Sequence, residues 1–518
     1  MTAAALATTV PAAGAAAPAD ADAPVRARRA AQPDLGPNVR VFDPRTPAEE
    51  IQAALDAAAE QAGAEFGTGR YAFLFKPGSY DVDVRLGCYT SVAGLGTHPD
   101  DVTVNGAVRA AGRDRPGDGD EAPANPWRSA ENLAVVPAGG DHLWAASQGA
   151  PLRRVHVRGR LCLSPGEGGR DGAGFVADSV VDGPVVDAAG QRWLFRDSSV
   201  ANWSTTAAGQ PDATVGQVFA GVEEAPARSL PAPPCGTLPT SPLSREKPFL
   251  YVDGAGAYRV FLPAPHRDGV GPTWAAGPPE GTSVPLERFF VARPEDSARA
   301  VNRALAQGRH LLLTPGVYRL ADTIRVKWAG TVVLGLGYAT LVPQDGVVAM
   351  TVADARGVRI AGLLFDAGPC GSRALLEVGD RCGGRVDPRE PASVQDVFFR
   401  MGGADAGLTA AALVVNSDNV LLDHVRAWRA DRGARAGRAV GTAADGVVVH
   451  GAGVLATGLS AEHFQQHDVV GNGESGRTVV FRNEPPCDPP DRAAYRRPDG
   501  TAGWTVGALG ADARHHEA

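Results

Sequence analysis

The sequence predicts an all-β protein built from two tandem parallel β-helices, each opened by an N-terminal capping helix. Three observations predict this fold class. The phrase FLFKPGSY at 73–80 is nearly repeated as LLLTPGVY at 311–318. Each copy follows a helix pattern, at 46–60 and 294–307, and precedes a glycine-punctuated strand, SVAGLG or VVLGLG. Short β runs separated by turn residues then recur through the second half, so two similar modules are expected.

Each helix pattern carries its own local signals. In the first, Thr46 is placed to cap, Pro47 occupies the first helical position and Glu49 completes a capping box. In the second, Val301 and Leu305 lie four residues apart on one face. A helix at the open end of a β-helix covers strand edges that would otherwise pair with other chains, so both helices are expected to be caps.

The β runs of the second half align as one strand-turn-strand phrase. Segments 351–366, 414–428 and 448–462 each hold two valines six residues apart, with a turn between them. Short strands at near-regular spacing fit a sandwich, a barrel or a solenoid. Repetition of a single phrase favours the solenoid, in which each coil pairs with the next along its length.

Length and composition divide the chain into four parts. Its 518 residues are too many for one compact core, and proline and glycine concentrate in 224–289. We expect a first β-helix at 38–223, a connector at 224–289 and a second β-helix at 290–518 with a shortened C-terminal end. Residues 1–37 contain a short apolar run and small-residue A-x-A sites. They predict either the remnant of a signal peptide, and hence export, or a disordered tail.

Composition restricts the classes of partner. The formal net charge is −8 and lysine occurs only at positions 76, 247 and 327, so no basic cluster predicts nucleic-acid binding. No run of 18 apolar residues predicts a membrane span. The six cysteines form no C-x-x-C pair, and Cys370 and Cys382 are either a disulfide across a loop or isolated thiols. We expect a monomer without metal or other cofactor.

Polar side chains are densest between 458 and 490. Glu462 and Glu484 each end a β run and are 22 residues apart, about the length of one coil. Since adjacent strands lie ~4.8 Å apart, the two carboxyls are expected in one patch. Two carboxyls flanking a bond are what glycoside hydrolysis requires, and the alternative is two solvated glutamates on a polar face. His463 and His467 are four apart, but in a strand this spacing favours a surface role over a metal site.

Two motifs connect these residues to a known family. The segment AEHFQQHD at 461–468, followed by NEPPCDPP at 483–490, resembles the paired motifs of glycoside hydrolase family 55, the β-1,3-glucanases or laminarinases. The stretch GQRWLFRDSSVANW at 190–203 is similar to that family as well. The resemblance implies two tandem right-handed parallel β-helices with an active site between them, and inverting hydrolysis of a β-glucan polysaccharide or oligosaccharide. The alternative is a glycan-binding β-helix protein without turnover.

The resemblance also implies roles for the two glutamates. Glu484 matches the general acid, and Glu462 matches the carboxylate that helps to hold the attacking water. Pro485 and Pro486 follow the acid directly. They are expected to stiffen the loop and exclude water, which would favour the protonated form of Glu484.

Further site residues follow from the weaker match in the first module. Gln191 and Ser198 are expected to supply polar groups to the attacking water, with a polar turn as the alternative. Ser199 and Trp203 from the same segment, together with His463, are expected to contact the substrate. A pectin-acting β-helix enzyme is disfavoured, because the sequence holds no aspartate cluster suited to Ca²⁺.

Overall fold

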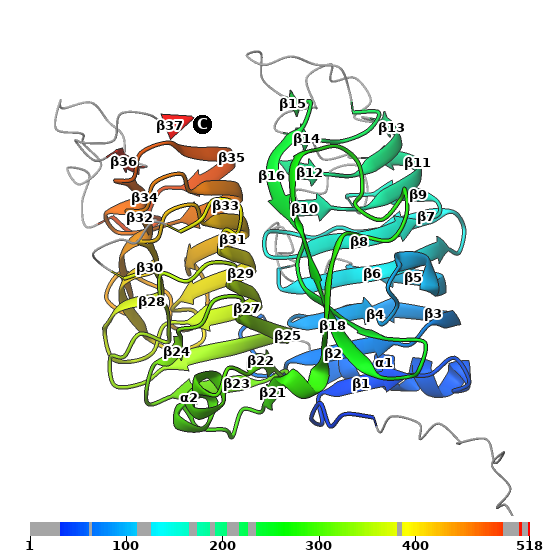
Figure 1. Cartoon of the computed structure of the whole chain (residues 1–518), viewed down its shortest axis with the longest axis horizontal. Coiled ribbons are helices and arrows are strands. Elements are labelled where there is room, and N and C mark those ends of the chain that lie inside the picture. Colours follow the sequence, from blue (N-terminus) through cyan, green and yellow to red (C-terminus); the bar gives the residue numbers. More distant parts are fainter. Residues whose placement is uncertain are drawn as a thin grey trace, which may run out of the picture.

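Two stacks of parallel strands stand side by side, and a connector runs down their junction (Figure 1). The computed structural model describes residues 32–61, 65–110, 126–164, 174–186, 192–204, 217–225, 235–380 and 386–489, with two short strand segments at 507–509 and 516–517. Successive coils in each stack pair in parallel, so the predicted all-β class with two parallel β-helices is confirmed.

The longest ladder of the first β-helix runs through alternate strands of the chain. Its order is β1 (Val39–Phe42), β2 (Tyr71–Phe75), β4 (Thr90–Gly94), β6 (Arg128–Pro137), β8 (Pro151–Val157), β10 (Gly174–Ala177), β12 (Trp193–Arg196), β14 (Gln217–Ala220) and β15 (Cys235–Leu238). The strands on its other sides are β3 (Gly78–Arg85), β5 (Val102–Arg109), β7 (Asp141–Leu143), β9 (Arg160–Cys162), β11 (Val180–Val186) and β13 (Ser199–Ser204), with a 3-10 turn η1 (Pro99–Asp101). Because β15 pairs with β14, this ladder extends past residue 223, where the sequence placed its end.

The connector forms two small antiparallel sheets. One pairs β16 (Ser241–Arg245) with β19 (Pro265–Gly269). The other contains β17 (Phe249–Val252), β18 (Tyr258–Pro263) and β20 (Gly281–Pro285), followed by a 3-10 turn η2 (Leu286–Arg288).

The second β-helix has two long parallel sheets. The first sheet contains β21 (Phe289–Ala292), β22 (His310–Leu313), β25 (Val332–Pro343), β27 (Arg359–Asp366), β29 (Ser393–Met401), β31 (Leu421–Arg429), β33 (Leu455–Glu462), β35 (Gly476–Glu484) and β37 (His516–Glu517), with β23 (Val317–Leu320) beside β25. The second sheet contains β24 (Ile324–Val326), β26 (Met350–Val352), β28 (Ser372–Val378), β30 (Gly407–Val415), β32 (Gly441–Val449), β34 (His467–Gly471) and β36 (Gly507–Leu509).

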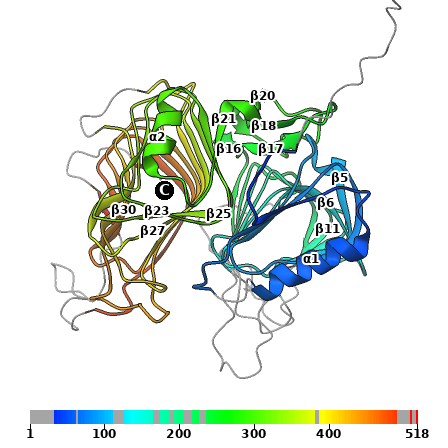
Figure 2. The same ribbon diagram turned by 90° about the horizontal axis from the view of Figure 1, so that it is seen from below.

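A helix lies at the same end of each stack (Figures 1 and 2). These helices are α1 (Ala48–Gln61) and α2 (Ala298–Ala306), close to the predicted ranges. Ile51 and Leu55 of α1 are buried in the core of the first β-helix, and Val301 and Leu305 of α2 are buried in the core of the second. The predicted capping helices are therefore confirmed.

The repeated Pro-Gly phrase forms the same latch in both modules. The Tyr80 hydroxyl donates to the carbonyl of Phe42, the last residue of β1, and to that of Lys76 four residues before it. The Tyr318 hydroxyl likewise donates to the carbonyls of Ala292, the last residue of β21, and Thr314. Each tyrosine thus ties the first strand of its module to the turn after the second, which explains why the phrase occurs twice.

One detail of the predicted coil alignment is wrong. Val352 lies in register with Val415 and Val449 through β28 and β30, rather than with residues 414 and 448. The second valines, Val358 and Val420 among them, do enter one core as expected. The turn between the paired strands is one residue longer in the first phrase, and equal spacing in the sequence concealed this difference.

Each coil of the second β-helix bends at one residue with left-handed backbone. Asp396, His424, Gly458 and Val480 have φ between 48° and 68° and occupy matching positions on successive coils, where the pairing between strands skips one residue. The first β-helix has a matching column that includes Arg154. Positive φ disfavours branched side chains, so Val480 is held there by its neighbours. Glu462 and Glu484 each follow such a bend by four residues.

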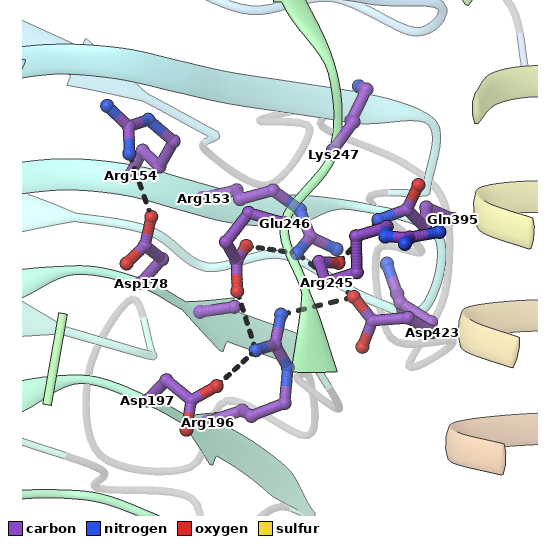
Figure 3. Close-up of polar contacts among 12 residues, drawn as sticks. Arg153, Arg154, Asp178, Arg196, Asp197, Arg245, Glu246, Lys247, Gln395 and Asp423 are labelled. Carbon is purple, nitrogen blue, oxygen red and sulfur yellow. Dashed lines mark hydrogen bonds and ion pairs between the residues drawn. The ribbon is translucent and has the colours of Figure 1, made fainter. Parts of the chain in front are cut away.

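A buried network of charges joins the two β-helices and the connector (Figure 3). Arg153 of β8 donates to Asp396 at 3.0 Å and to Asp423 at 3.1 Å, both in the second β-helix. Arg196 of β12 donates to the same Asp423 at 3.1 Å, and Glu246 of the connector lies within 2.9 Å of both arginines. All five side chains are buried. Each arginine lies beside at least two carboxylates, which compensate its charge.

Aromatic rings fill the junction beside this network. Tyr89 and Trp127 of the first β-helix pack with Tyr338, Phe398 and Trp428 of the second in one buried cluster. The Tyr338 hydroxyl crosses the junction and donates to the carbonyl of residue 149 at 2.9 Å. Apolar packing and paired charges therefore fix how the two β-helices are placed relative to each other.

Candidate active site

Glu462 and Glu484 occupy paired positions on adjacent coils. They are the last residues of β33 and β35, and these strands pair in parallel with Glu462 opposite Glu484. The spacing of 22 residues therefore corresponds to one coil. Arg482 joins the two carboxyls, because Nη2 donates to Glu484 Oε1 at 2.5 Å and Nε lies 3.6 Å from Glu462 Oε1.

Glu462 is a buried, ionised carboxylate. Its Oε2 accepts from Arg426 Nη2 at 2.8 Å, and its Oε1 accepts from the Ser460 hydroxyl at 2.7 Å. Burial alone would raise the pKa of Glu462, but the charges of Arg426 and Arg482 and these hydrogen bonds outweigh it and lower the pKa. Glu462 is therefore suited to hold positive groups in place and unsuited to donate a proton.

Glu484 is more open to solvent, with 40% of its side chain exposed. The prolines that follow do not bury it, so the expected exclusion of water by this loop is not observed. Cys487 is exposed in the same loop, and partial burial raises the pKa of its thiol. An exposed carboxyl at the end of a coil can reach the leaving oxygen of a substrate.

His463 lies directly against Glu484. Its backbone N–H donates to the Glu484 carbonyl at 2.8 Å, and its Nε2 lies 3.5 Å from Glu484 Oε2. The other ring nitrogen, Nδ1, is 2.8 Å from the carbonyl oxygen of Pro485. His467, by contrast, pairs with Asp445 at 2.9 Å on the second sheet, so the two histidines do not face one ligand.

The first β-helix reaches the site through Gln148. With its amide oxygen turned toward Arg482, Gln148 accepts from Nε at 2.7 Å and from Nη2 at 2.9 Å. Its backbone carbonyl also accepts from Arg426 Nη1 at 3.4 Å. The Arg426 guanidinium lies over the rings of Trp127 and Trp428, at 5.5 and 5.0 Å from their centroids. Side chains from both β-helices thus surround the two glutamates.

Two of the residues predicted from segment 190–203, Ser198 and Trp203, contact groups of the first β-helix rather than the two glutamates. The Ser198 hydroxyl is buried and bonds only backbone, donating to Arg196 O and accepting from Ser179 N. The Trp203 ring packs edge-on against Phe195 and Phe219, inside the first β-helix.

The other two residues predicted from segment 190–203 are Ser199 and Gln191. Ser199 is the first residue of β13 and pairs with Val180. Gln191 lies outside the described residues, as does Cys382 of the expected disulfide. The placement of Ser198 and Trp203 argues against their predicted contacts with water and substrate, because both side chains face the interior of a coil.

A second buried carboxyl lies behind the site. Asp468 is fully buried, and its Oδ1 accepts from the Phe464 backbone N–H at 3.2 Å. Burial raises the pKa of Asp468 to about 7, and the charges of Glu462 and Glu484 add to the shift.

Sequence reasoning missed Gln148, Arg426, Arg482 and Asp468. Asp468 closes the AEHFQQHD motif, and Arg482 precedes Glu484 by two residues, so both stood beside a recognised signal. Gln148 and Arg426 carry no local pattern, because contacts between the two modules bring them to the site.

Two further features were sought among the described residues, a metal-site cluster and a membrane-spanning helix. No three His, Cys, Asp or Glu side chains among them converge as a metal site would require. None of the helices in the described ranges has the length and apolar character needed to cross a bilayer.

Two parallel β-helices with paired glutamates at the ends of adjacent coils define a glycoside hydrolase of the β-helical class. Residues 289–484 match the family model described as the LAM55 pectate lyase-like domain. The chain belongs to glycoside hydrolase family 55.

Three similar proteins or structures are from Streptomyces sp. SirexAA-E. The chain is 48% identical over 468 residues to an exo-β-1,3-glucanase of Streptomyces sp. SirexAA-E, covering 90% of this chain and 75% of the relative. The solved structure of sacteLam55A from the same organism is 46% identical, with a TM-score of 0.87 over 93% of this chain and 86% of that one. A glutamate-to-alanine variant of sacteLam55A in complex with glucose superimposes with a TM-score of 0.86 at 45% identity, over 94% of this chain and 86% of that one.

Proposed function

We propose that this protein is an exo-acting hydrolase of β-1,3-linked glucan, with Glu484 as general acid and inversion at the anomeric carbon. The observation that carries the proposal is the pairing of Glu462 with Glu484 on adjacent coils. The exo-β-1,3-glucanase that is 48% identical supports the substrate and the mode of attack.

The two glutamates have different roles because their environments differ. Glu484 is the exposed carboxyl and protonates the leaving oxygen as the glycosidic bond breaks. Glu462 stays ionised and acts on the attacking water through Arg426 and Arg482, which it holds. No covalent intermediate forms, because water attacks the anomeric carbon directly from the opposite face.

We assign Gln148, from the first β-helix, to orienting the attacking water. Its amide oxygen faces Arg482, so its amide N–H groups are left to orient water or a substrate hydroxyl. This is the role that the sequence predicted for Gln191 and Ser198. His463 is also part of the site, where it contacts Glu484.

The protein acts outside the cell in this proposal. The support is a polysaccharide substrate, which is too large to enter a cell intact, and the apolar run with small-residue sites in 1–37. Immunodetection in cultures of the organism that produces the protein should find it in the medium, and retention in the cell pellet would contradict export.

Sugar release from a panel of purified glucans tests the function. Laminarin and short β-1,3-oligosaccharides should release glucose, whereas β-1,4-glucan and pectin should not. Proton NMR of the first product should give the α-anomer, because inversion converts the β-linkage. Binding to laminarin without hydrolysis would instead support a glycan-binding protein, and a β-anomeric first product would refute inversion.

A further inference from the structure

The surroundings of His463 specify one tautomer of its ring. The carbonyl oxygen of Pro485, 2.8 Å from Nδ1, can only accept, so Nδ1 carries a hydrogen. Nε2 faces two carboxylates, Glu484 Oε2 at 3.5 Å and Asp431 Oδ2 at 3.8 Å. Only 8% of the His463 side chain is exposed, and its backbone φ of 67° lies in the left-handed region, so the turn fixes the ring beside Glu484.

The two oxygens of Glu484 have opposite surroundings. Oε1 accepts from Arg482 Nη2 at 2.5 Å, and a charged donor there favours the ionised carboxylate. A general acid must instead carry a proton before each turnover. The oxygen left for that proton is Oε2, which faces His463.

We propose that His463 is a positioning residue that shares one proton with Glu484 and so keeps the general acid loaded beside Arg482. This inference rests on the proposed function. When the ring is neutral, Nε2 accepts from the protonated Oε2. When the ring is charged, Nε2–H donates to the carboxylate. One proton is thus held by the pair rather than by either residue alone.

The shared proton returns to its starting position in each catalytic cycle. The proton moves from Glu484 Oε2 to the leaving oxygen, which keeps the electron pair of the broken bond. Water forms the new bond to the anomeric carbon and releases one proton to solvent. Glu484 is then a carboxylate, and it regains a proton from solvent by way of His463 Nε2.

The other charges around the ring also affect this proton. Asp431, after β31, favours the charged ring. Arg429, at the end of β31, donates to the His463 carbonyl at 3.0 Å, and its charge is compensated by Asp488 at 2.6 Å.

The test compares His463→Gln with His467→Gln, a matched histidine that pairs with Asp445. Turnover is measured from pH 4 to 8 on laminari-oligosaccharide and on an aryl β-glucoside whose leaving group needs no protonation. In His463→Gln, the alkaline limb for oligosaccharide should move down by about one pH unit or more, because Arg482 then acts on Glu484 alone. The aryl substrate should lose far less, and His467→Gln should keep the wild-type profile.

A second variant, His463→Ala, tests whether an added imidazole can replace the missing ring. His463→Ala, checked for an unchanged melting temperature, should regain oligosaccharide turnover when imidazole is added. An active wild type whose variants lose turnover equally at every pH and on both substrates would overturn the shared proton. A wild type that hydrolyses no β-1,3-glucan would refute the proposed function instead.

Discussion

At the scale of single residues, substitution of Glu484 and of Glu462 should affect turnover of two kinds of substrate differently. Glu484→Gln removes the proton that the leaving sugar needs, so turnover of laminarin should fall by ~100-fold or more. An aryl β-glucoside with a good leaving group should be affected much less. Glu462→Gln should lower turnover of both substrates similarly, because attack by water is needed whichever group leaves. Initial rates on the two substrates check this, and wild-type rates for Glu484→Gln on laminarin would contradict the assignment.

Asp468 should make stability depend on pH. Its pKa is about 7 in the folded protein and near 3.8 when exposed. Between these values the unfolded chain loses a proton that the folded chain keeps, so stability falls as pH rises from about 4 to 7. The melting temperature of Asp468→Asn relative to wild type should therefore rise across this window. Asp380→Asn, at an exposed carboxyl, is the control, and parallel curves for Asp468→Asn and wild type would refute the prediction.

Residue-level prediction succeeded where chain spacing determines position. The register of Glu462 with Glu484 follows from one coil length, which the sequence displays. Trp203 was expected at the substrate, but its side chain points into the coil, and aromatic character alone does not indicate which face of a strand a residue occupies. Gln148 was missed because packing between modules brings it to the glutamates.

At the scale of elements, the tyrosine latches should stabilise each module separately. Tyr80→Phe or Tyr318→Phe removes the one hydroxyl hydrogen that two carbonyl oxygens share. The strand-end carbonyl, of Phe42 or Ala292, keeps a backbone N–H donor, so each change should lower the free energy of unfolding by about 1 kcal/mol. Denaturant unfolding measures the loss. Tyr258→Phe is the matched control, since the buried hydroxyl of Tyr258 has no hydrogen-bond partner among the described residues. Equal effects of all three changes would argue against the latches.

The elements that repeat in sequence were predicted well. Both capping helices and both Pro-Gly phrases were found because each has local signals for its start and end. The column of left-handed residues was not predicted, because Asp396, His424 and Val480 share no residue type and their conformation is imposed by stacking. The one-residue shift in the valine alignment has a different origin, a turn that is one residue longer in the first phrase.

At the scale of the whole molecule, the charges at the junction should be sensitive to removal of a single partner. Asp423→Ala leaves Arg153 and Arg196 buried with less negative charge, which should cost about 3 kcal/mol or more in unfolding free energy. Because the network is buried, 0.5 M salt should change this cost little. Asp322→Ala, which breaks an exposed pair with Arg325, should cost about 1 kcal/mol or less. Similar costs for the two variants would contradict a structural role for the network.

Activity should also require both modules. Residues 32–238 and 239–518 expressed as separate chains should each fail to hydrolyse laminarin, because Gln148 belongs to one and both glutamates belong to the other. Mixing the chains should restore some activity. Full turnover by the second module alone would show that Gln148 is dispensable.

The polarity of the charges at the junction determines which modules can pair. The repeated phrase marks two similar modules, and these meet there. Arg153 and Arg196 stand on one side and Asp396 and Asp423 on the other. Two copies of the first β-helix placed face to face would bury arginine against arginine, and two of the second would bury aspartate against aspartate. These charges disfavour self-pairing of like modules and favour the pairing of one half of the chain with the other.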